Sequence, residues 1–181
     1  MSSRRQILAF AAALFAAPAL AQTPDPTPHG APAPVPVRVA LTTTEGVVVL
    51  ELYPDKAPVT VANFLRYVDA RKYDGAEFYR ASRPATRTGL SHTDGTIALG
   101  RFAPGTAKSD FFICVGDQSY LDANPAAAGD NLGFAAFGRV VEGMEVVRRI
   151  LAMPLDPQAG KGVMKGEILK APVRIRSARR V

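Results

Sequence analysis

The chain has 181 residues, of which 48% are hydrophobic and 21% charged, and its formal net charge is +6. This length suits one soluble globular domain with short appendages and excludes two full domains. The charge does not indicate a nucleic-acid-binding protein, because no basic stretch is interleaved with aromatic residues. The single cysteine, Cys114, excludes an internal disulfide, so burial alone must hold the fold together.

Residues 1–21 have the three parts of a secretory signal. Arg4 and Arg5 supply the positive start, an apolar stretch follows, and Ala19-Leu20-Ala21 forms a small-x-small cleavage site before Gln22. The apolar stretch is shorter than the about 20 residues that span a bilayer. We therefore predict an exported, periplasmic protein without stable membrane insertion after signal cleavage. The two adjacent arginines leave a twin-arginine export route open.

Residues 22–36 are predicted to form a proline-rich linker. Six of the chain's 15 prolines fall between Pro24 and Pro36, which favours extended polyproline geometry and excludes a packed element. The domain is expected to occupy residues 37–181.

The pattern after the linker is mainly β. Alternating apolar residues predict a hairpin over 37–52, turning at Glu45-Gly46, and helical spacing predicts an amphipathic helix from about 59 to 70. Further strands are expected near 78–79, 96–99, 111–115, 134–141 and 164–175, with a second helix over 144–151. This order suggests a closed antiparallel β-barrel with a helix at each end.

Eight short motifs in the domain resemble one family. They are TEGVVVLELY at 44–53, DKAP at 55–58, VANF at 61–64, YDG at 73–75, FYR at 78–80, HTDGT at 92–96, FFIC at 111–114 and FGRVVEGM at 137–144. Their order and composition resemble the cyclophilin-type peptidyl-prolyl cis-trans isomerases, especially the short bacterial members. The resemblance runs from residue 37 to the C-terminus. It implies a cyclophilin-like barrel capped by two α-helices and an isomerase of X-Pro bonds that needs no cofactor or metal.

By this resemblance, Arg80 is the catalytic residue. An X-Pro bond rotates over a barrier of about 18–20 kcal/mol, because resonance gives the C–N bond double-bond character. The twisted transition state loses that resonance and leaves a lone pair on the proline nitrogen. A fixed guanidinium can donate a hydrogen bond to this lone pair, which the planar ground state does not offer. On position alone, Arg80 would be interpreted as an exposed strand residue in a surface ion pair.

The resemblance also implies an apolar socket for the proline ring. Phe112 is expected to line the socket, with Leu121 and Phe134 near its rim. Phe111 should point into the barrel, because neighbours on a strand face opposite sides.

The rest of the expected site binds the substrate backbone or borders the socket. Gly100, Arg101 and Phe102 correspond to the family segment that pairs with the substrate main chain. Asp110 stands where the family usually has glutamine, and Tyr120 where eukaryotic members often have tryptophan. Phe134 stands at a position where a histidine is common in the family. These changes retain a pocket but alter its polarity.

One stretch departs from the family. Between FYR and HTDGT, only residues 81–91 remain where the family has a strand ending in Gln-Gly-Gly and a long loop, roughly two dozen residues more. The missing stretch normally holds the glutamine that orients the catalytic arginine. The sequence therefore indicates a barrel that lacks one strand and an Arg80 that is less firmly held.

Two functions of different classes remain open. The first is a periplasmic prolyl isomerase, expected to be monomeric, that acts on exported, proline-containing polypeptides during folding. The alternative is a cyclophilin-like module that binds peptides or acts as a chaperone with little or no catalysis. The motifs favour the enzyme, and the shortened segment favours the binding module. A third, weaker hypothesis is a structural envelope protein.

Overall fold

The described part of the chain begins with the predicted hairpin. In the computed structural model, which describes residues 35–81, 92–124, 126 and 131–181, strand β1 (Val37–Thr43) pairs antiparallel with β2 (Val47–Leu52). Thr43 closes the turn, since its Oγ1 donates to the Gly46 carbonyl at 2.8 Å and accepts the Glu45 N–H at 3.0 Å. The predicted signal and all but the end of the linker lie outside the described residues.

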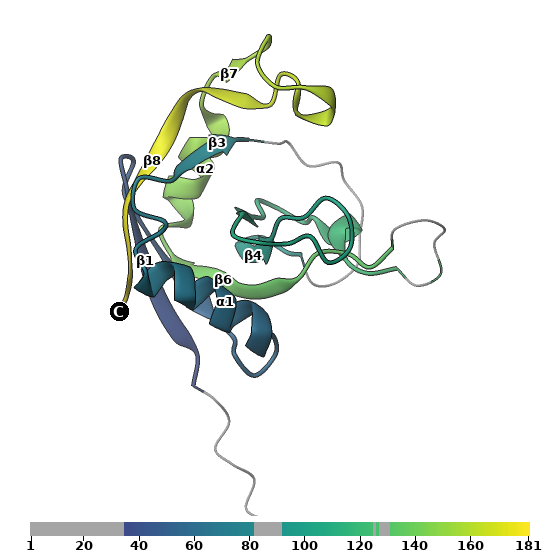
Figure 1. The fold of residues 1–181 in the computed structure, drawn as a ribbon. Helices are drawn as coiled ribbons and strands as arrows, with labels where there is room; N and C mark the ends of the chain where they lie inside the picture. Colours follow the sequence, from purple (N-terminus) through teal and green to yellow (C-terminus); the bar gives the residue numbers. More distant parts are fainter. Residues whose placement is uncertain (1–34, 82–91, 125, 127–130) are drawn as a thin grey trace, which may run out of the picture. The chain divides into compact units, whose positions relative to one another are not determined.

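An eight-stranded antiparallel sheet carries the domain (Figure 1). Its strand order is β3-β8-β1-β2-β6-β4-β5, and β7 pairs with β8 off this path. The remaining strands are β3 (Glu77–Arg80), β4 (Thr96–Leu99), β5 (Phe111–Ile113), β6 (Ala136–Glu142), β7 (Leu155–Asp156) and β8 (Ile168–Arg180).

The sheet curls into a half-barrel. Within the described ranges, the terminal strands β3 and β5 do not pair with each other. The prediction of a mainly β domain with two helices is therefore confirmed, and the described residues form a half-barrel where the sequence suggested a closed barrel.

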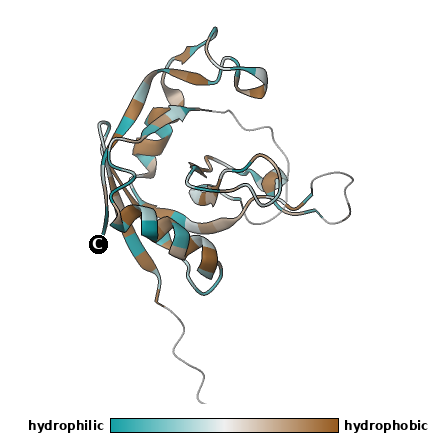
Figure 2. Ribbon diagram, in the orientation of Figure 1, coloured by the Kyte–Doolittle hydropathy of each residue, from teal (hydrophilic) through white to brown (hydrophobic). Residues whose placement is uncertain are grey.

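Two helices pack against the sheet. Helix α1 (Pro58–Asp69) starts with proline at its first turn, which fits because that position needs no N–H donor. Its buried residues recur at helical spacing, and apolar and polar residues alternate along it (Figure 2). Helix α2 (Met144–Ala152) follows Gly143, whose φ is +84°. A Cβ there would lie 2.1 Å from the Val47 carbonyl oxygen, so only glycine fits. No helix in the described ranges is long and apolar enough to cross a membrane.

The hydrophobic core centres on Phe64 of α1, which is fully buried. Its ring centroid lies 5.1 Å from that of Tyr73, 5.2 Å from that of Phe137 and 5.6 Å from that of Phe111. Phe111 thus points inward, as predicted, and in a strand this directs Phe112 to the opposite face.

The bounds of three strands differ from the sequence prediction by two residues or more. β6 starts at Ala136, two residues late. β5 ends at Ile113, two residues early. β8 starts at Ile168, because residues Gly162–Met164 form a 3₁₀ turn, and it continues to Arg180. Gly162 and Gly166 take positive φ angles, which extended strands do not accommodate.

Candidate active site

A cavity of about 440 Å³ opens between the two terminal strands of the sheet. One wall is formed by residues 77–81, in and after β3, and the other by residues 110–115, in and around β5. Arg80 and Phe112, the predicted catalytic and socket residues, therefore line one cavity from opposite sides. The sequence interpretation required such a shared groove.

Most of the other predicted site residues line the same cavity. They are Gly100, Arg101, Asp110, Tyr120, Leu121 and Phe134. Phe102 is the exception, because its side chain is 86% exposed and is not part of the lining.

Glu167 holds the guanidinium of Arg80. Nε of Arg80 donates to Oε2 of Glu167 at 2.8 Å, and Nη2 donates to the same oxygen. These contacts leave Nη1 unengaged by Glu167. The partnership follows from strand register, because Arg80 lies opposite Ile168, the first residue of β8. Glu167 was not predicted from the sequence, because it stands 87 positions away from Arg80 and in no family motif.

Phe112 is fixed by two aromatic neighbours. Phe134 meets it edge to face, with centroids 5.4 Å apart and an interplanar angle of 87°. The imidazole of His92 stacks on it at 6.1 Å with an angle of 16°. Packing on both sides restricts the rotamers of the Phe112 ring, so the predicted socket residue has a fixed position.

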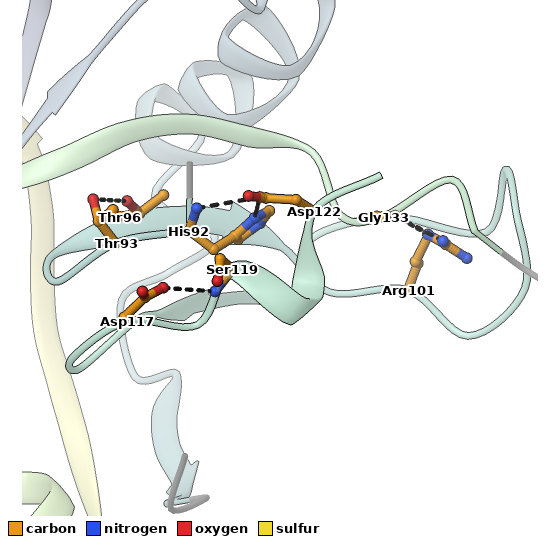
Figure 3. Close-up of polar contacts among 8 residues, drawn as sticks. All are labelled: His92, Thr93, Thr96, Arg101, Asp117, Ser119, Asp122 and Gly133. Atoms are coloured by element: carbon orange, nitrogen blue, oxygen red, sulfur yellow. Dashed lines mark hydrogen bonds and ion pairs between the residues drawn. The ribbon is translucent and has the colours of Figure 1, made fainter. Parts of the chain in front are cut away.

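His92 is in turn held by Asp122 (Figure 3). The ring is almost completely buried, Nδ1 contacts Oδ1 of Asp122, and the backbone N–H of His92 donates to the same oxygen at 3.2 Å. His92 belongs to the HTDGT motif but received no role from the sequence, and nothing in the sequence singled out Asp122. Asp122 therefore fixes His92, and His92 in turn packs against the ring of Phe112.

Arg101 closes another side of the socket. Its Nε and Nη2 donate to the Gly133 carbonyl at 2.9 and 2.7 Å (Figure 3). Its guanidinium carbon lies 5.1 Å from the Phe134 centroid. Gly133 has a φ of +63°, and a Cβ there would lie 2.4 Å from the Ala123 nitrogen. The close approach of these backbones therefore requires glycine.

A backbone hydrogen bond joins Gly100, which follows β4, to Asp110, which precedes β5. The Gly100 N–H donates to the Asp110 carbonyl at 2.8 Å. The exposed side chain of Asp110 and that of Tyr120, which is half exposed, give the rim a polar character.

Cys114 also lines the cavity, but its thiol is suited to packing and not to chemistry. The side chain is buried, and this burial raises the pKa of the thiol to about 12, with smaller contributions from Asp122 and Asp94. A thiol is nucleophilic only as thiolate. In the described ranges, no three His, Cys, Asp or Glu side chains gather as a metal site.

We expect Cys114 to react with a thiol-specific disulfide reagent about a thousandfold more slowly in the folded protein than in urea at pH 8. The reason is that burial lowers the thiolate fraction by about that factor. The rate of absorbance change on labelling measures the effect. Equal rates in folded and unfolded protein would contradict the buried position.

Known proteins are similar to this chain in sequence and in fold. The sequence profile of the family described as cyclophilin type peptidyl-prolyl cis-trans isomerase/CLD matches residues 38–89 and 81–180. The chain is 33% identical over 161 residues to the peptidyl-prolyl cis-trans isomerase of Acinetobacter baylyi, covering 76% of this chain and 81% of the relative. It is 31% identical over 166 residues to peptidyl-prolyl cis-trans isomerase B of Escherichia coli, covering 77% and 96%.

A solved structure agrees on the fold. The cyclophilin type peptidyl-prolyl cis-trans isomerase of Cryptosporidium parvum aligns with a TM-score of 0.62 and 16% identity, covering 81% of this chain and 98% of that one. The chain thus belongs to the cyclophilin-type peptidyl-prolyl cis-trans isomerase family, and prolyl isomerisation is its function.

Proposed function

We propose that the cavity between β3 and β5 is the site at which this isomerase rotates X-Pro bonds of exported polypeptides during their folding. The observation that carries the proposal is that Arg80 and Phe112 line the same cavity. A permanently charged donor and an apolar socket are the two groups that the chemistry requires.

Each wall of the cavity has a separate task. The proline ring packs on Phe112, Phe134 and Leu121, which places the X-Pro nitrogen in the cavity. Arg80 then donates a hydrogen bond from the opposite wall to the nitrogen lone pair that develops as the amide twists. This bond forms only in the transition state, so it lowers the barrier without stabilising the bound substrate.

Glu167 takes the task that a glutamine has in the family. It fixes Arg80 through Nε and Nη2, so the guanidinium has one orientation before the substrate arrives. Such preorganisation matters because a displacement of about 1 Å can cost about a hundredfold in rate. A carboxylate differs from an amide in also neutralising part of the positive charge.

Replacing Arg80 by alanine is expected to lower kcat/KM about 100-fold, because the donor to the twisted nitrogen is lost. Replacement by lysine should rescue little, since lysine lacks the rigid fork. A protease-coupled or NMR exchange assay on an X-Pro peptide measures the rate. The matched control is Arg38→Ala, which removes another strand arginine in an exposed ion pair, with Glu51 at 3.2 Å. Unchanged catalysis in Arg80→Ala would refute the assigned role.

Glu167→Ala is expected to lower kcat about tenfold with little change in KM, because Arg80 loses its fixed orientation and the socket is untouched. Glu167→Gln should retain most of the activity, since an amide oxygen still accepts from Nε. Glu51→Ala, which frees Arg38 instead, serves as the control. A faster Glu167→Ala enzyme would mean that the carboxylate restrains Arg80 from the substrate, contrary to this proposal.

We also propose that residues 1–21 direct the chain to the periplasm, where it acts as a monomer on unfolded polypeptides and not on nucleic acid. The support is the charged start, apolar stretch and small-x-small site in the sequence. Mass spectrometry of the protein from a periplasmic fraction is expected to find Gln22 as the first residue. Recovery from the cytoplasm with an intact residue 1 would contradict export.

A weakly catalytic peptide-binding module is the second candidate, and the half-barrel favours it. An alignment of 161 residues that uses 76% of a 181-residue chain leaves about two dozen positions of the Acinetobacter relative without a counterpart. That number equals the roughly two dozen residues by which the segment after Arg80 is expected to be shortened, and it supports this interpretation. This second function is identified if the unmodified protein binds the X-Pro peptide but does not accelerate its isomerisation in the assay described for Arg80→Ala.

A further inference from the structure

The strand path of the half-barrel ends at β3 on one side and at β5 on the other. β3 pairs with β8, and β5 pairs with β4, and within the described ranges neither has a strand on its other side. Such edges are templates for pairing with another strand. Here the two edges are the opposite walls of one cavity.

The directions of the two edges determine what fits between them. Six pairings connect β3 to β5 along the sheet, and all six are antiparallel. An even number of reversals means that β3 and β5 run in the same direction. One added strand that runs in the opposite direction would therefore pair antiparallel with both.

The backbone hydrogen-bonding groups of β5 are oriented so that an added strand could pair with them. The Cys114 N–H donates to the Thr96 carbonyl, and the Asp110 carbonyl accepts from Gly100, so these even-numbered positions face β4. Backbone groups alternate along an antiparallel strand. The N–H groups of Phe111 and Ile113 therefore face the cavity side.

The lining of the cavity specifies the side chains of the added strand. Val48, Val147, Ile150 and Leu151 line it from β2 and α2, so one face of the strand meets apolar groups. On the other face, the strand would lie between Glu77 and Arg80 of β3, which are exposed, and Phe112 of β5, so it meets charges and water on one side and an aromatic ring on the other. A strand with alternating apolar and polar residues satisfies both faces.

We propose that this cavity binds an extended, proline-free polypeptide strand that runs antiparallel to β3 and β5 and completes the sheet. Proline is excluded from the paired positions because it has no N–H to donate. This activity is distinct from X-Pro isomerisation and does not depend on the guanidinium of Arg80.

The probe is the peptide acetyl-Lys-Val-Thr-Val-Thr-Val-Lys-amide, added to the full chain and followed by NMR hydrogen exchange. We expect exchange of the Phe111 and Ile113 amides to slow at least about tenfold, because they gain acceptors. The Phe112 amide, already directed at β4, should not change. Arg80→Ala should show the same protection although its isomerase activity is lost.

Two controls test the pairing and the apolar lining. The same peptide N-methylated at every valine and threonine loses its donors to both edges, and its methyl groups block the close approach of the two edge backbones, so it should protect neither amide. Leu151→Asp should abolish the protection, because it places a charge against the valines. Val163→Asp should retain the protection, since Val163 is exposed and outside the cavity.

Three results would overturn the proposal. The first is equal protection by the N-methylated peptide, and the second is no protection by either peptide. The third is slow exchange of Phe111 and Ile113 without peptide, as slow as that of Phe112. That result would mean that the chain itself or a second copy already fills the cavity.

Discussion

An edge-to-face contact between Phe78 and Phe111, with centroids 5.8 Å apart, connects the two ends of the sheet. No backbone pairing joins β3 to β5 in the described ranges, so the spacing of the cavity walls depends on contacts of this kind. Arg80 lies two residues beyond Phe78, and Phe112 directly follows Phe111. The aromatic contact therefore sets how far the guanidinium stands from the proline socket, and the core around Phe64 supports it from within.

The sequence was informative wherever a local pattern determines structure. Alternation identified the first hairpin, and helical spacing with proline in the first turn identified α1 within a residue or two. Pairings between distant strands were not predictable, because they depend on which edges meet in three dimensions. The start of β8 shows the same limit, since apolar residues near Met164 resemble a strand although glycine geometry turns the chain there.

The site divides in the same way. Arg80 and Phe112 could be predicted because each stands in a short family motif, FYR and FFIC, whose residues are adjacent in the sequence. Glu167 was not, since its position opposite Arg80 arises from the register between β3 and β8, and no local pattern records that register. Asp122 was missed for a related reason, because its partner His92 lies 30 positions earlier in the chain.

The open sheet has different consequences for catalysis and for binding. The proposed catalysis needs Arg80 held within a narrow range of orientations, and the two contacts from Glu167 provide this locally. Binding of an extended chain needs unpaired edges, and β3 and β5 each have one within the described ranges. Both proposed uses share the walls of one cavity, and a bound strand would take a place where the resemblance leads us to expect a strand in catalytically active relatives. Completing the sheet with a bound segment is therefore compatible with the proposed isomerisation, because the contacts that hold Arg80 come from Glu167 and not from the added strand.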